Sequence, residues 1–377
     1  MKKILFIVGS CHALGGVERV SRQLLKALSA DFPLSVVTAA AEAPVADGIT
    51  ALSLPDADDF NSAVNLDFLE GYIRREGIDI VINQGLVSMI SRRFTLSDPQ
   101  RFVHVMHACP DWLYQRERRA EFRPLSEGWK PLVRTLCCRY LSFYARWRVN
   151  DRLRGFLRSP GVFVVLDEDY RRQLRSLKGA ATARIEVMPN PSADFIKPSR
   201  RERTVLYAGR FTWADKHVER LLRIWKRVET VRDDWQLELC GDGPERGRLM
   251  QQAARLGLRR VSFRLPGPSE TLYEQASMLC LTSSYEGMSL SVMEAQQAGV
   301  VPVAFDINAG MRTLIADDET GVLVPPFREK EYARALLALM DDRLRRERLS
   351  DNARRFSGCF SQEKIMARWK TLLENLG

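Results

Sequence analysis

Residues 279–295 are LCLTSSYEGMSLSVMEA. The apolar run Leu279–Thr282 has the length of a buried strand, a polar loop with Glu286 and Gly287 follows it, and a helical pattern begins near Leu290. A strand that leads directly into a helix is the repeating unit of α/β proteins with parallel sheets. Because ligands of such sheets bind at the carboxyl ends of the strands, Glu286 lies where a ligand is expected.

The same alternation of short apolar runs and longer amphipathic stretches extends in both directions. In the second half it predicts further strands at Thr204–Ala208, Gln236–Cys240, Arg260–Phe263, Val301–Ala304 and Gly321–Val324, and three final helices at 329–340, 342–356 and 362–376. In the first half it predicts strands at Lys3–Val8, Leu34–Thr38, Ile78–Ile82, Phe102–Met106, Phe163–Leu166 and Ile185–Met188, with helices at Gly16–Ala30 and Leu66–Glu76. The predicted fold class is α/β, with doubly wound sheets.

The chain has 377 residues, more than a single hydrophobic core usually serves. The alternation stops at Pro189–Ser192, where two prolines suit neither a strand nor a helix. We therefore predict two Rossmann-like domains that face each other across a cleft: 1–190, with a basic helical insertion at 111–160, and 191–355. We expect a helix in 356–377 to pack back on the first domain.

Composition limits the class of protein. The hydrophobic fraction of 45% and the charged fraction of 28% are typical of a folded globular chain. The apolar run Ile4–Val8 is too short for a signal peptide, and the sequence holds no apolar stretch that could span a bilayer, so we expect a cytoplasmic protein. Seven cysteines without paired spacing argue against a zinc site or a disulfide framework.

Positive charge is concentrated in one segment. Residues 111–160 hold twelve Lys and Arg against five Asp and Glu, which is +7 of the net charge of +10. Such a segment favours an acidic partner such as phosphate, phospholipid or nucleic acid. Apolar side chains also recur there at helical spacing: Leu132, Leu136, Tyr140, Phe143 and Trp147. This helix face can lie on an anionic membrane surface or pack as core, and both interpretations stay open.

Three motifs follow predicted strands. Gly15-Gly16 opens a helix without the Gly-x-Gly-x-x-Gly spacing of a dinucleotide site, so it serves either an anion or a simple turn. Arg210 and Lys216 suit the two phosphates of a nucleoside diphosphate, although cations at such positions are usually solvated. Glu286, the amides of Gly287 to Leu290 and a carboxylate at Glu294 suit a ligand rich in hydroxyls.

In this order, the motifs resemble glycosyltransferase family 4, whose enzymes have the GT-B fold and retain anomeric configuration. The resemblance is carried by Glu286-x7-Glu294, Gly209-Arg210 with Lys216, Gly241-Asp242-Gly243-Pro244, Gly15-Gly16-Val17-Glu18, Pro189-Asn190 and Thr320–Val324. Two features depart from the family: Thr313 stands where many relatives have an acid, and the basic insertion leaves the acceptor undefined.

The resemblance implies a role for each candidate residue. Arg210 and Lys216 would bind the donor diphosphate, Glu286 the transferring sugar, and Glu294 the ribose. His107 would face the donor sugar and complete a catalytic set with Arg210, Lys216 and Glu286. The remaining donor-binding residues would be Gly15, Gly16, Leu265, Gly287, Met288, Ser289 and Leu290.

The resemblance also implies a reaction. We expect metal-independent, retaining transfer from a nucleotide sugar, most often UDP-linked in this family, to a glycan or lipid-linked acceptor in cell-surface polysaccharide or lipopolysaccharide synthesis. No cofactor is expected, and no Asp-x-Asp metal motif follows a first-domain strand. One alternative is an epimerase or phosphorylase on the same fold. Another is a nucleic-acid-binding protein, since aromatic residues such as Trp112, Tyr114 and Trp129 interleave with the basic ones, but we expect no nucleic acid partner.

Overall fold

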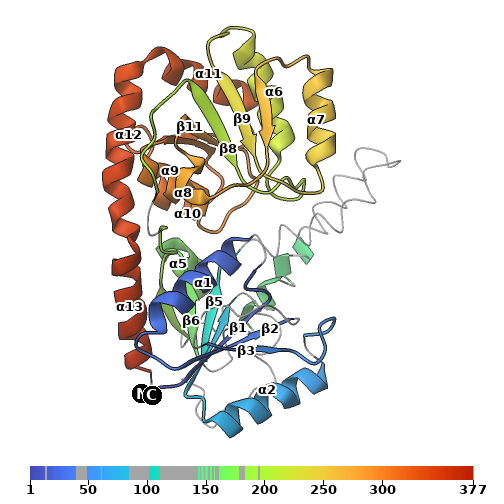
Figure 1. Ribbon diagram of the computed structural model, residues 1–377, viewed down its shortest axis with the longest axis vertical. Helices are drawn as coiled ribbons and strands as arrows, with labels where there is room; N and C mark the ends of the chain where they lie inside the picture. The colour runs from blue at the N-terminus through green and yellow to red at the C-terminus, as the bar shows by residue number, and fades with distance from the viewer. Residues whose placement is uncertain are drawn as a thin grey trace. The chain divides into compact units, whose positions relative to one another are not determined.

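The structure, a computed structural model, describes residues 1–12, 15–39, 49–60, 62–84, 102–110, 143–144, 146–147, 149–151, 153–154, 157, 161–177, 183–193 and 196–376. Contacts divide the chain into two compact units (Figure 1). The first comprises Met1–Pro189 together with Met366–Gly377, and the second comprises Asn190–Ile365. The final helix therefore crosses the division between the units.

Within its described residues, the first unit holds a parallel sheet of order β3-β2-β1-β4-β5-β6-β7. Its strands are β1 Ile4–Val8, β2 Leu34–Thr38, β3 Thr50–Ser53, β4 Ile80–Gln84, β5 Phe102–Met106, β6 Val162–Val165 and β7 Arg184–Val187. Its helices include α1 Gly16–Leu28, α2 Ala63–Glu76, α5 Glu168–Arg175 and α13 Gln362–Glu374. Strand β3 was not predicted from the sequence, because it lies at the sheet edge with Ala51 and Ser53 exposed.

Local sequence explains the helices of this unit. Helix α1 turns one apolar stripe inward, formed by Val20, Leu24 and Leu28. Helix α2 begins where the Ser62 side chain accepts a hydrogen bond from the amide of Asn65, and it ends at Gly77 in the left-handed conformation. Helix α2 packs on one face of the sheet, where Leu69 and Tyr72 join a buried cluster with Leu5 of β1.

Helix α13 is tied to the start of the chain. The Lys2 ammonium donates to the carbonyls of Leu373 and Leu376, and Lys370 forms an ion pair with Asp31 at 2.5 Å. Trp369 and Leu373 are buried. Residues 366–376 thus belong to the first unit rather than to the second.

The second unit, described throughout residues 196–365, holds a parallel sheet of order β10-β9-β8-β11-β12-β13. Its strands are β8 Thr204–Ala208, β9 Gln236–Cys240, β10 Val261–Arg264, β11 Ala276–Leu281, β12 Val301–Phe305 and β13 Val322–Val324. Its helices are α6 Val218–Glu229, α7 Arg246–Arg255, α8 Ser269–Leu272, α9 Leu290–Ala298, α10 Ala309–Leu314, α11 Glu329–Asp341 and α12 Arg343–Ser357. The predicted α/β class with doubly wound parallel sheets is confirmed.

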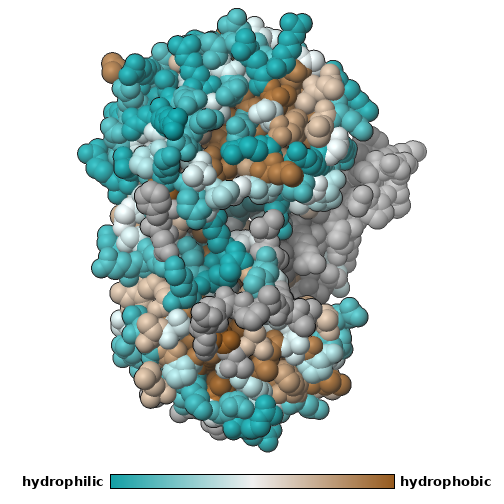
Figure 2. Space-filling view, in the orientation of Figure 1, coloured by the Kyte–Doolittle hydropathy of each residue, from teal (hydrophilic) through white to brown (hydrophobic). Residues whose placement is uncertain are grey.

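Helices cover both faces of this sheet (Figure 1). Helices α6, α7 and α11 pack on one face around the fully buried Trp225 and Tyr332, and α12 packs on α9 on the other. The flank formed by α12 is hydrophilic in Figure 2, as expected for a helix with six arginines. Strand β11 begins three residues before the predicted Leu279, because the small residues Ala276 and Ser277 are buried there without adding to the apolar run.

The buried face of the basic segment differs from the apolar face that the sequence predicted. Of that face, Phe143 and Trp147 lie within the described residues, and they are 71% and 53% exposed. Val149, Leu153 and Leu157 form the buried stripe instead. The core interpretation is therefore wrong for Phe143 and Trp147, whereas Leu132, Leu136 and Tyr140 lie outside the described residues. In the described parts of the chain, no helix has both the length and the apolar character needed to cross a membrane.

Candidate active site

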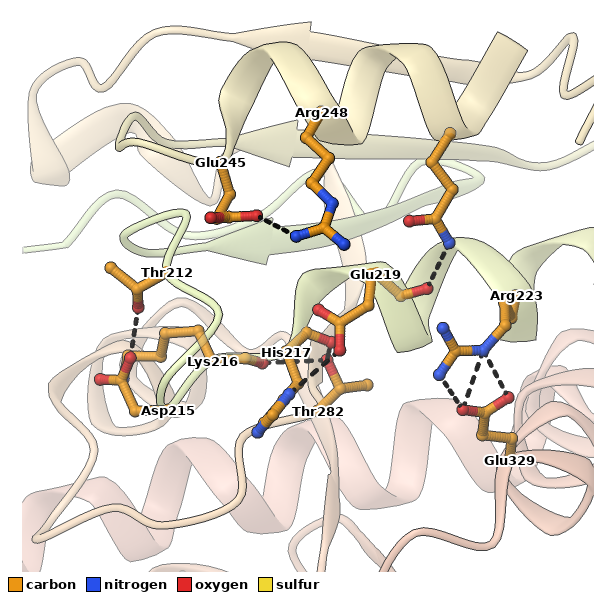
Figure 3. Close-up of polar contacts among 11 residues, drawn as sticks. Thr212, Asp215, Lys216, His217, Glu219, Arg223, Glu245, Arg248, Thr282 and Glu329 are labelled. Carbon is orange, nitrogen blue, oxygen red and sulfur yellow. Dashed lines mark hydrogen bonds and ion pairs between the residues drawn. The ribbon is translucent and has the colours of Figure 1, made fainter. Parts of the chain in front are cut away.

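The candidate site of the second unit lies at the C-terminal ends of β8 and β11, two neighbouring strands whose connections run to opposite sides of the sheet. Strand β8 is followed by β9 on one side, whereas β11 is followed by β12 on the other, so the loops after β8 and β11 diverge at the carboxyl edge. Hydrogen bonds join the two loops: Ser284 N donates to Asp215 O at 2.8 Å, and Thr282 Oγ1 donates to the carbonyl of His217 at 3.0 Å (Figure 3). The loop after β8 and the loop after β11 therefore form one continuous surface.

A lysine and a glutamate meet at this surface. Lys216 Nζ lies 2.7 Å from Glu286 Oε1, and their side chains are 17% and 9% exposed. Ser283 Oγ donates to the same oxygen at 2.7 Å, and the Asn308 amide donates to the backbone carbonyl of Glu286. Lys216 and Ser283 thus fix the orientation of the Glu286 carboxylate, and Asn308 holds the backbone of the same residue.

Arg210 lies on the same loop as Lys216 but is far more exposed. Its side chain is 60% exposed, with Nη2 3.7 Å from Asp215 Oδ2. Asp215 also accepts a hydrogen bond from Thr212 Oγ1 (Figure 3). Beneath the loop, Tyr207 donates to Arg210 O at 2.9 Å, and burial raises the pKa of Tyr207 well above its usual range, with Glu286 and Asp215 adding to the effect. Tyr207 therefore remains a neutral donor that supports the loop from below.

Helix α9 starts directly after the Glu286 loop. Its first residue is Leu290, and Ser289 is its N-cap. Gly287, Met288 and Ser289 therefore precede the helix instead of forming its first turn. The positive end of the helix dipole faces this loop, which favours a negatively charged group there.

Glu294 lies one turn further along α9. It is 4% exposed, and its Oε2 accepts a hydrogen bond of 2.8 Å from Tyr273 Oη. Leu265 follows β10 at the same edge of the sheet, and its side chain is 58% exposed. Both residues therefore lie in the unit that carries Arg210, Lys216 and Glu286.

Glycines let the loops after β8 and β9 approach each other closely. Gly209 N donates to Cys240 O at 3.1 Å, and Phe211 N donates to Asp242 O at 2.8 Å. A Cβ atom on Gly241 would lie 1.9 Å from Gly209 O. The backbone that carries Arg210 is thus held by direct contact with the next loop.

The histidine candidate lies in the first unit. His107 follows β5, and its Nε2 is hydrogen-bonded to the Gln84 side chain at the end of β4. The nearby His104 is stacked between Phe102 and Phe163, and burial lowers its pKa to about 4. His104 therefore stays neutral inside the sheet, whereas His107 lies at the C-terminal ends of the strands.

The glycine pair of the first unit begins α1, with Gly15 as its N-cap and Gly16 as its first residue. The Glu18 carboxylate folds back over this start, since a Cβ on Gly15 would lie 1.9 Å from Glu18 Oε2. A carboxylate of the chain itself thus lies where an anion was expected.

Sequence reasoning missed several residues of the site. Ser283, Asp215 and Asn308 orient or support the predicted side chains, and Tyr273 contacts Glu294. Ser283, three residues before Glu286 at a strand end, had a recognisable position. Nothing in the sequence marks Tyr273 as a site residue, because its sequence context is that of any buried aromatic residue. Among the described residues, no group of three or more His, Cys, Asp or Glu side chains could hold a metal ion.

Two family models match the chain. Glycosyltransferase Family 4 matches residues 14–191, and Glycosyl transferases group 1 matches residues 192–356. Together they span most of both units. The chain therefore belongs to glycosyltransferase family 4 and has the GT-B fold, which confirms the resemblance noted in its motifs.

Individual relatives are similar to this chain over part of its length. An exopolysaccharide phosphotransferase of Streptomyces coelicolor is 32% identical over 240 residues, which cover 60% of this chain and 25% of that protein. The amylovoran biosynthesis glycosyltransferase AmsD of Erwinia amylovora is 26% identical over 265 residues, which cover 66% of this chain and 72% of AmsD. The chain thus spans a quarter of the first relative. The structure of Anabaena HepE in complex with UDP-glucose aligns with 100% of this chain and over 100% of its own, at 17% identity. The TM-score of 0.74 shows the same fold.

Proposed function

We propose that this protein transfers a sugar from a UDP-linked donor to a glycan or lipid-linked acceptor in the synthesis of a cell-surface polysaccharide or lipopolysaccharide. The observation that carries the proposal is the contact between Lys216 and Glu286 at the divergence of β8 and β11. A cation and a carboxylate side by side suit a ligand that has both a diphosphate and a sugar with free hydroxyls. UDP-glucose in the HepE structure is a ligand of this kind.

The geometry supports a division of roles. Lys216 has three donors, so its ammonium can keep its bond to Glu286 while it binds phosphate, and the exposed Arg210 can bind the second phosphate. As the glycosidic bond breaks, charge grows on the leaving diphosphate, and both cations stabilise it. Glu286 Oε1 is held by two donors, which leaves Oε2 to accept a hydrogen bond from a hydroxyl of the sugar.

The resemblance to the family supports a finer mechanism. We propose that the cations do the work of a metal ion, that the donor phosphate accepts the proton of the acceptor hydroxyl, and that the sugar keeps its anomeric configuration. His107 would face the donor sugar, and Gly15, Gly16 and Leu265 would complete the donor site. Incubating the protein with UDP-sugars and following product formation with and without acceptor tests this function. Conversion without any acceptor would favour an epimerase instead.

The two glutamates should behave differently when replaced. Glu294→Ala should weaken UDP binding by about 1.5 to 3 kcal/mol, because a charge-assisted contact to the ribose is lost. Glu286→Ala should mainly lower turnover, since Glu286 contacts the sugar and its loss leaves Lys216 available to the diphosphate. Calorimetric titration with UDP, together with transfer rates at saturating donor, measures both effects. Equal losses of UDP affinity would contradict this division of roles.

We also propose that the basic segment holds the enzyme on an anionic membrane. Phe143, Tyr144 and Trp147 are exposed, the rings of Tyr144 and Trp147 stack at 6.1 Å, and Arg146 is exposed between them. Aromatic side chains beside basic ones are favoured at the interface of a bilayer. Each cation near such a surface contributes about 1 kcal/mol, so a segment with a net charge of +7 can bind without insertion.

Sedimentation with vesicles tests the membrane proposal. We expect binding to vesicles that contain phosphatidylserine, weaker binding at high salt because surface charges are screened, and weaker but not abolished binding in Phe143→Ser with Trp147→Ser, which keeps every charge of the segment. Val231→Ser is the matched control, because it removes an apolar side chain that is 67% exposed in the second unit. If the wild-type protein stays in the supernatant at low salt, the proposal fails.

A further inference from the structure

A buried tyrosine contacts the carboxylate that we assign to ribose binding. Tyr273 directly follows α8 and has no exposed surface, and its hydroxyl donates to Glu294 Oε2 at 2.8 Å. Glu294 comes from a different element, the middle of α9. The hydrogen bond therefore joins the connection between β10 and β11 to the candidate donor site.

The backbone at Tyr273 and at the residue after it is held by hydrogen bonds and ion pairs. The carbonyl of Tyr273 accepts a hydrogen bond from Ala276 N at 3.1 Å. The next residue, Glu274, accepts from Arg200 N at 2.7 Å and forms ion pairs with Lys197 and Arg200 at 2.7 and 2.8 Å. The hydroxyl of Tyr273 is thus a donor at a defined place rather than one on a mobile side chain.

A donor at a defined place orients the glutamate. A glutamate side chain has three torsions, and a buried carboxylate needs hydrogen-bond donors to offset the cost of its burial. By holding Oε2, Tyr273 selects one orientation of the carboxylate and so fixes the direction of Oε1. Ligand affinity then benefits, because the site needs no reordering when the ligand arrives.

We propose that Tyr273 is a positioning residue for donor binding, which orients Glu294 toward the ribose hydroxyls of the nucleotide. This inference rests on the proposed function, because it takes a nucleoside diphosphate as the ligand. Tyr273 does not touch the ligand in this role and acts only through Glu294. The phenyl ring provides the packing and the hydroxyl orients Glu294. Removal of the hydroxyl oxygen alone therefore separates the two contributions.

Tyr273→Phe tests the inference, with UDP and 2′-deoxy-UDP as probes in calorimetric titrations. The variant should bind UDP about fivefold to tenfold more weakly, the usual effect of one hydrogen bond to a charged group. Its preference for UDP over 2′-deoxy-UDP should shrink, and its turnover at saturating donor should stay at the wild-type level. Tyr332→Phe is the matched control, because Tyr332 is equally buried in the same unit but bonds to the backbone at Leu281 and Val303.

A double substitution separates positioning from packing. If Tyr273 acts through Glu294, Tyr273→Phe should cause no further loss of UDP affinity in a Glu294→Ala background, which has no side-chain acceptor at this position. Additive losses, or a Tyr273→Phe variant with wild-type preference for UDP, would overturn the positioning role and leave the proposed function standing. A wild-type protein that binds no UDP would overturn both.

Discussion

Replacing Lys216 by alanine should reduce the catalytic efficiency of transfer by about 2 to 4 kcal/mol of transition-state stabilisation, roughly 30-fold to 1,000-fold. Two effects combine. The leaving diphosphate loses a cation, and Glu286, whose side chain is 9% exposed, loses the ion pair that offsets its burial. Arg210→Ala should have a smaller effect on the folded protein, because its side chain is 60% exposed and its contact with Asp215 is long.

Transfer kinetics with a UDP-sugar measure this loss, and circular dichroism shows whether the variant is folded. Lys226→Ala is a suitable control, since it removes the same charge from the last turn of α6, away from the loop that follows β8. A folded protein with both Arg210→Ala and Lys216→Ala and with wild-type turnover would rule out this loop as the donor site.

Replacing Gly241 by alanine should destabilise the second unit by about 3 kcal/mol or more. The new methyl group would lie 1.9 Å from Gly209 O and 2.9 Å from the Phe211 ring, and one of these neighbours is backbone that cannot rotate away. The loops after β8 and β9 would have to separate, which would also displace Arg210. Both stability and donor binding should therefore fall.

Thermal or urea unfolding measures the change in stability. Gly247→Ala is the matched control, because no atom lies within 4 Å of its added Cβ and the residue is in the first turns of α7. Alanine is a better helix former than glycine, so this variant should be unchanged or slightly more stable. Equal unfolding midpoints for Gly241→Ala and wild type would show that the loops are not packed as described.

The apolar pattern predicted most of the fold because buried parallel strands are short runs of large apolar residues. Strands β2, β5, β8 and β9 have the predicted bounds. The pattern failed where a strand lacks such residues: β3 is an exposed edge strand, and β11 begins with two small residues. In both cases burial is decided by neighbours distant in sequence, which a local pattern does not contain.

The candidate site was predictable to a similar degree. The loops that carry Arg210, Lys216 and Glu286 follow strands that the sequence predicted. The parallel sheet therefore predicted that these loops lie on the same side, at the C-terminal ends of the strands. The direct pairing of Lys216 with Glu286 did not, because 70 residues separate them and strand order alone brings β8 beside β11. The same holds for Tyr273 and Glu294, which meet only once α8 and α9 are packed.

The return of α13 to the first unit has a consequence for biosynthesis. The whole second unit, Asn190–Ile365, is inserted between two pieces of the first. On the ribosome, β1 to β7 emerge before the second unit, but Trp369 and Leu373, buried residues of the same first unit, emerge after the second unit has been made. The second unit is continuous and can fold as soon as it emerges. The unit that is synthesised first is therefore the one that is completed last.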